Sequence, residues 1–138
     1  GVVESYIHAG GKLGVMVEVG CETDFVAKTD DFKAFAKNVA MHIAAANPVA
    51  VNRDDVPLEV LQREKDIYVN QALESGKPQQ IVEKIVVGKV EKYLAEICLM
   101  EQKYVKNDEL SIQDLLNELV AKMGENISIK KFARFQIG

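Results

Sequence analysis

Tryptophan is absent from the 138-residue sequence, and there are only three prolines and two cysteines. Two cysteines, Cys21 and Cys98, are too few for a disulfide framework, and they exclude a zinc site built from cysteine pairs. No apolar run approaches the ~20 residues of a membrane-spanning helix, because the longest uncharged stretch, 39–52, is short and contains polar residues. The sequence therefore predicts no contact with the membrane interior.

Basic residues are outnumbered, with 17 Lys and Arg against 21 Asp and Glu and a net charge of −4. The densest basic cluster is Lys130, Lys131 and Arg134, and alternation along a strand would divide even these between two faces. We therefore expect no direct nucleic-acid partner. The sequence begins at Gly1 rather than Met, without a signal-peptide pattern, which indicates a piece of a longer protein.

Residue sets typical of catalysis are also missing. Gly10-Gly11 fits a hairpin turn rather than a phosphate-binding loop. Neither histidine has a serine or cysteine beside it. His42 borders an apolar helical stripe, which favours a structural role, and His8 beside the turn is expected near the surface. The sequence predicts no enzyme, no metal and no cofactor.

Three segments alternate as strands do. Residues 2–8 and 13–19 flank the glycine pair and predict a β-hairpin. Residues 127–137 form a last strand. From simple alternation we expect one face of the sheet to hold Val15, Val17 and Phe135, and the other to hold Tyr6, Met16 and Phe132.

Helical periodicity predicts the remaining elements. An apolar stripe covers 32–44, with Asp30 and Asp31 expected to cap its start. Two further helices flank Ser75–Pro78 as a helical hairpin, and Gly88 is expected to break or kink the second one. The last helix is predicted to begin at Ser111, with Asp114 completing a capping box, and to end at Gly124.

This order predicts an α+β domain with a small three-stranded antiparallel sheet, helices packed on one face, and a helical hairpin. Apolar residues on both sheet faces exceed what one layer of helices can cover. We therefore expect the second face to pack against its copy in a symmetric dimer.

The segment Thr23-Asp24-Phe25-Val26 does not fit a purely structural pattern. It follows a strand directly and precedes a separately capped helix. A phenylalanine in such a connector is either a satellite core residue or a contact offered to a partner. The residues alone leave both interpretations open.

Four blocks of the chain resemble the elongation factor Ts family, and they occur in the family's order. They are Cys21–Lys28, Ala40–Ala45, Ser75–Pro78, and Gly124–Ile127 with the strand ending at Arg134-Phe135. The resemblance implies a guanine nucleotide exchange factor for elongation factor Tu, in a bacterial-type cytosol or an organelle of bacterial descent.

The resemblance also implies an arrangement of domains. Residues 1–138 correspond to the core, or dimerisation, domain of the family, without its N-terminal helical domain. One signature and one hairpin are present, as in the short members, which pair as homodimers. The alternative is a dimerisation or interaction module of the same fold that lacks exchange activity.

Site residues follow by matching motifs. Asp24 and Phe25 match the Asp-Phe that the family pushes toward the magnesium and phosphate end of the GTPase pocket, with Thr23 and Val26 completing the motif. Met123 and Gly124 match a contact after the last core helix. His8 matches a histidine at the first hairpin turn. Asp24 either hydrogen-bonds the displaced loop or repels the phosphates.

Overall fold

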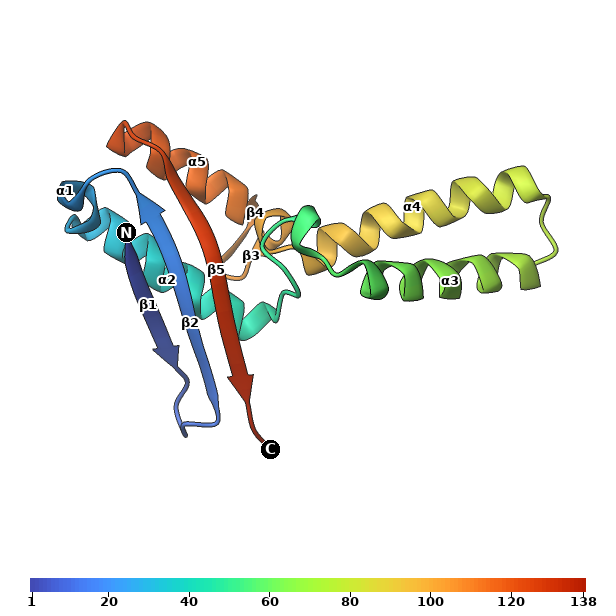
Figure 1. Ribbon diagram of the computed structural model, residues 1–138, viewed down its shortest axis with the longest axis horizontal. Helices are drawn as coiled ribbons and strands as arrows, with labels where there is room; N and C mark the ends of the chain where they lie inside the picture. Colours follow the sequence, from blue (N-terminus) through green and yellow to red (C-terminus); the bar gives the residue numbers. More distant parts are fainter.

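The computed structural model describes all residues, 1–138, and contains two kinds of structure: a sheet covered by helices, and a protruding arm (Figure 1). In chain order the elements are β1 (Val2–Ile7), β2 (Leu13–Cys21), α1 (Asp24–Ala27), α2 (Asp30–Ala46), η1 (Arg53–Asp55), α3 (Leu58–Glu74), α4 (Gln79–Ile97), η2 (Leu99–Glu101), β3 (Lys103–Tyr104), β4 (Asn107–Ser111), α5 (Ile112–Met123) and β5 (Ile127–Gln136). The predicted α+β class is confirmed.

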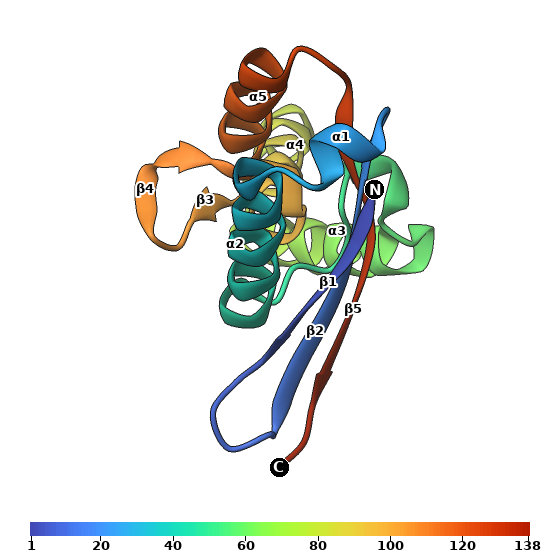
Figure 2. The ribbon, with the colours of Figure 1, turned by 90° about the vertical axis from the view of Figure 1, so that its left-hand side faces the viewer.

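The main sheet has the order β1-β2-β5 and is antiparallel throughout. Helices α2 and α5 lie on the same side of it (Figure 2). The inner face of β2 presents Val15, Val17 and Val19, all essentially buried, to these helices. The predicted sheet, with helices on one face, is therefore present.

A bulge in β5 corrects our assignment of residues to the two faces. Glu18 pairs with Lys131 but Val19 pairs with Ile129, so Lys130 is one residue in excess. One extra residue reverses the direction of every later side chain. Residues opposite each other share a face, and Val17 lies opposite Phe132, so Phe132 points inward. Simple alternation had placed Phe132 outward.

The same register corrects two further residues. Tyr6 lies opposite Val15 and belongs to the inner face, where it packs against the core. Phe135 lies opposite Gly14 and belongs to the outer face. Val15 and Val17 share one face and Met16 lies on the other, as expected.

Helix α2 forms as its stripe predicts, with Phe32, Val39 and Ile43 fully buried. Its cap differs from the prediction. Thr29 is the N-cap, and its hydroxyl accepts a hydrogen bond from the amide of Phe32. Asp30 and Asp31 lie inside the first turn, where a carboxylate opposes the helix dipole without capping.

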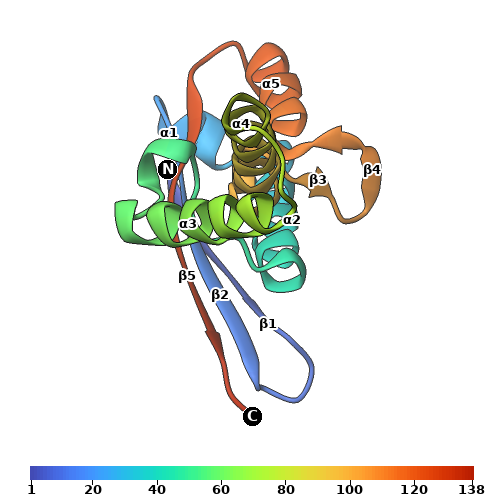
Figure 3. The same ribbon diagram turned by 90° about the vertical axis from the view of Figure 1, so that its right-hand side faces the viewer.

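The arm consists of α3 and α4, packed antiparallel around the turn at Ser75–Pro78 as predicted (Figures 1 and 3). Its outer part has a small core of its own, made of Ala72, Val82 and Val86. Of the expected break or kink at Gly88, the break is wrong, because α4 continues through this residue from Gln79 to Ile97. A glycine costs a helix only about 1 kcal/mol, and α4 packs through buried residues on both sides of Gly88, Val82 and Val86 before it and Leu94 after it.

The base of the arm is fixed by a charged cluster and a small apolar one. Arg53 donates to Glu91 at 2.7 Å and to Glu101 at 2.8 Å. Beside it, Cys98 is fully buried with Val56 and Leu94. Both cysteines are free thiols. No helix of the chain is both long enough and apolar enough to span a membrane.

A candidate partner-binding surface

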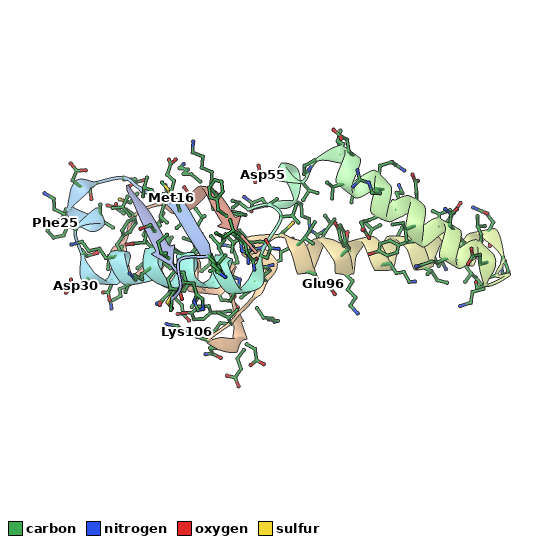
Figure 4. All side chains as sticks on the ribbon, turned by 90° about the horizontal axis from the view of Figure 1, so that it is seen from below. Met16, Phe25, Asp30, Asp55, Glu96 and Lys106 are labelled. Atoms are coloured by element: carbon green, nitrogen blue, oxygen red, sulfur yellow. The ribbon has the colours of Figure 1, made fainter.

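Phe25 is the most conspicuous side chain of the connector after β2. The connector forms the single-turn helix α1, whose N-cap is Thr23. Val26 and Ala27 face inward and are buried, while Phe25 is 81% exposed. Figure 4 shows Phe25 at the end of the molecule opposite the arm, pointing away from the body. The structure thus rejects the interpretation of Phe25 as a satellite core residue.

The end of α5 lies beside this connector. The helix begins with the predicted capping box of Ser111 and Asp114, and it ends at Gly124, whose φ of 73° is left-handed. Glycine adopts that conformation without steric cost. Thr29 lies in the chain between α1 and α2, and its hydroxyl oxygen is 3.7 Å from the sulfur of Met123. The structure therefore brings the 23–26 segment and the Met123–Gly124 segment together.

Hydrogen bonds join these two segments directly. The carboxylate of Glu125 accepts bonds from the backbone amides of Glu22 and Thr23, at 3.0 and 3.1 Å, and from the Thr23 hydroxyl at 3.0 Å. Glu125 lies inside the block Gly124–Ile127 but was not among the predicted site residues. Its partners are about one hundred residues away along the chain, and no local spacing reveals such a contact.

His8 lies elsewhere. It follows β1 at the hairpin turn, is exposed, and its Nδ1 is 2.8 Å from the hydroxyl of Tyr6. Phe25 follows β2 at the other end of the sheet. Eight steps along β2, from Leu13 to Cys21, span roughly 27 Å at the usual strand rise. One copy of the chain therefore does not bring His8 to the surface formed by α1 and the end of α5.

The residues of this surface are suited to binding another protein. No three His, Cys, Asp or Glu side chains come close enough together to hold a metal ion. In the interior of the protein, burial lowers the pKa of His42 and raises that of the Cys98 thiol. An exposed aromatic ring and an adjacent exposed carboxylate at Asp24 can bind and displace a protein surface.

A second uncovered surface is the outer sheet face, which we define by five apolar side chains. Each is between 54% and 72% exposed, although the same strands are buried on their other side. Met16 belongs to the central strand β2 and lies on the side away from α2 (Figure 4). Beside it Lys131 and Glu18 approach to 3.9 Å. The five residues are Val3, Ile7, Met16, Phe135 and Ile137.

Comparison with known proteins assigns the family. The sequence model described as elongation factor TS matches residues 1–138. Proteins named elongation factor Ts from Desulfotalea psychrophila and Desulfosudis oleivorans are 70% and 62% identical over all 138 residues, which cover 70% of each relative. The relative from Heliobacterium modesticaldum is 56% identical, and the chain covers 64% of it. The chain belongs to the elongation factor Ts family of translation elongation factors.

Proposed function

We propose that this chain promotes GDP release from elongation factor Tu and catalyses no chemical reaction itself. The observation that carries the proposal is the 81% exposure of Phe25 on a helix whose next two residues, Val26 and Ala27, are buried. Membership of the family supports the same role. The chain then works where elongation factor Tu works, in a bacterial-type cytosol or an organelle of bacterial descent, and residues 1–138 form the core domain.

The mechanism is thermodynamic linkage. An exchange factor must bind the empty GTPase more tightly than the GDP-bound form, and the weakening is reciprocal. Burying the Phe25 ring in the partner contributes roughly 1.5–3 kcal/mol. If the ring displaces a wall of the nucleotide pocket, it disturbs magnesium ligands and phosphate-binding amides, which tolerate little movement.

The neighbours of Phe25 have distinct roles in this proposal. Thr23 and Val26 hold the turn, one as its cap and one as its buried anchor. Asp24 is exposed beside the ring and either hydrogen-bonds the displaced loop or repels the phosphates. Met123 and Gly124 extend the contact from the end of α5, because the two segments are adjacent.

The proposal includes a homodimer. The five exposed apolar side chains of the outer sheet face support it, since monomers rarely leave such a face open to water. A two-fold axis makes the interface from the same face of both copies. His8 lies at the opposite end of the sheet from Phe25, so we propose a composite site in which His8 of the mate contacts the same GTPase.

The test uses elongation factor Tu loaded with fluorescent GDP, chased by excess unlabelled GDP. Substoichiometric amounts of this chain should accelerate release through repeated turnover, and Phe25→Ala protein should not. Absence of acceleration at saturating concentration would overturn the exchange proposal. If the protein is still dimeric in that case, the result favours a dimerisation module of the same fold.

A further inference from the structure

Helix α1 is too short to be stable alone. It has four residues, and a single helical turn is costly to nucleate in water. Phe25 contributes no packing to it, because its ring is exposed. Val26 and Ala27 anchor one side of the turn in the core. The orientation of Phe25 therefore depends on whatever fixes the start of the helix.

Glu125 fixes that start. Its Oε1 accepts from the amides of Glu22 and Thr23, and its Oε2 accepts from the Thr23 hydroxyl. The Thr23 oxygen in turn accepts from the amide of Val26 at 3.3 Å. A hydroxyl has a single proton, and donating it to Glu125 leaves the lone pairs free for Val26. Bonds to a carboxylate are stronger than neutral ones.

Gly124 sets the place of Glu125. At φ 73° it reverses the chain, while its own amide still bonds the carbonyl of Val120 at 2.9 Å. Glu125 is the first residue after this reversal and thus faces the start of α1. A second tie follows at once, since the side-chain amide of Asn126 donates to the carboxylate of Glu22 at 3.0 Å.

We propose that Glu125 is a positioning residue for exchange: it locks the first turn of α1 so that Phe25 and Asp24 are held beside Met123. The effect of Glu125 on exchange rests on the proposed function, whereas its hold on α1 does not. Glu125 need not touch the partner. Because Glu125 already orders Phe25 in the free protein, Phe25 loses less conformational entropy on binding. Such preorganisation increases affinity.

The geometry is tested on the free protein by amide hydrogen–deuterium exchange. In Glu125→Ala the amides of Ala27 and Lys28, which do not touch Glu125 but close the α1 turn, should exchange about tenfold faster, as ~1.4 kcal/mol would give. Glu125→Gln should keep most of the protection, because its carbonyl still accepts from both amides. Glu118→Ala is the matched control, an exposed glutamate on α5. Unchanged protection in Glu125→Ala would overturn the lock.

The consequence is tested by a double-mutant cycle on binding to nucleotide-free elongation factor Tu. Glu125→Ala should weaken binding about tenfold with Phe25 present, as ~1.4 kcal/mol would give. In Phe25→Ala protein the same substitution should weaken binding by a clearly smaller factor, because only Asp24 is left to be positioned. A general loss of stability would weaken both backgrounds by the same factor, and that result would overturn the proposal. If the unaltered chain releases no GDP, the proposed function fails, while hydrogen exchange still decides whether Glu125 holds α1.

Discussion

The guanidinium of Arg134 in β5 donates two hydrogen bonds to one carbonyl oxygen, that of Ala44 in α2. The donor Nη2 lies at 2.9 Å and the donor Nε at 3.3 Å. Ala44 belongs to the last turn of α2, where carbonyl groups have no partner within the helix and carry a partial negative charge. Arg134 reaches it because the bulge at Lys130 turns this side chain inward.

Arg134→Met should therefore lower the free energy of unfolding by roughly 1.5–3 kcal/mol, the contribution typical of hydrogen bonds to charged groups. Methionine keeps much of the length but none of the donors. Denaturant titration measures the change. Lys37→Met, at an exposed position of α2 outside the outer sheet face, should change stability by less than about 0.5 kcal/mol, and equal losses for both variants would contradict the assignment.

Protonation of His42 should destabilise the fold. Its Nε2 lies 2.9 Å from the Gln102 carbonyl oxygen, and its Nδ1 accepts from the amide of Val105 at 3.3 Å, so the buried ring is neutral with its proton on Nε2. Burial lowers its pKa below the ordinary 6.5. The unfolded chain then binds more protons than the native one, and stability falls as the pH drops below about 6.5.

His42→Gln should remove this part of the pH dependence, whatever it does to stability at neutral pH. Denaturant titrations between about pH 7 and 5 measure the slope. The same substitution at exposed His8 is the control for the loss of a histidine as such. A slope that survives in His42→Gln would mean that other groups cause it.

Phe25→Ala should leave thermal stability almost unchanged and strongly reduce GDP release, because the ring faces solvent in the free protein. Val26→Ala, one residue further and 5% exposed, is the matched control. It removes buried methyl groups and should lower stability by about 1–3 kcal/mol. A Phe25→Ala protein that melts as early as the Val26→Ala protein would show that Phe25 packs in the fold.

Met16→Glu should convert a dimer into monomers, because it places a charge in the middle of the outer sheet face. Sedimentation equilibrium at micromolar concentration measures the mass. Leu58→Glu is the control, since Leu58 is also an exposed apolar residue, 81% accessible, but lies at the base of the arm. A monomeric mass for the unaltered protein would count against the dimer outright.

Mixed dimers should test the composite site. A heterodimer of Phe25→Ala and His8→Ala subunits has one site with both defects and one with neither. GDP release should therefore recover well above that of either parent after subunits are allowed to exchange. Confirmed heterodimers without recovery would show that both residues act from one subunit or that His8 takes no part.

Local patterns were enough to predict most of the elements. The stripe of α2 and the capping box at Ser111 depend on residues three or four apart, so they can be recognised in the sequence. The end of α5 depends on the single glycine Gly124 and can be recognised in the same way. The short pair β3 and β4 was not predicted, because Lys103–Tyr104 contributes only two residues to it. The break at Gly88 was wrongly expected because local propensity does not include the packing of α4 against α3.

The candidate site was predictable only in part. Phe25 could be found from a motif, but its exposure could not, since a connector phenylalanine fits either environment. The faces of β5 depended on one excess residue, Lys130, whose position is fixed by pairing with β2 and leaves no mark in β5 itself. Glu125 needed the fold, because its partners become neighbours only when β5 returns beside β2.

The separate core of the arm affects how the length of this protein can evolve. Beyond its base, α3 and α4 pack chiefly on each other around Ala72, Val82 and Val86, apart from the main core. Matched insertions or deletions of one turn in each helix would alter its reach by about 5.4 Å and leave the sheet and its surfaces intact. The arm is thus a segment whose length can vary among homologues without cost to the rest of the protein.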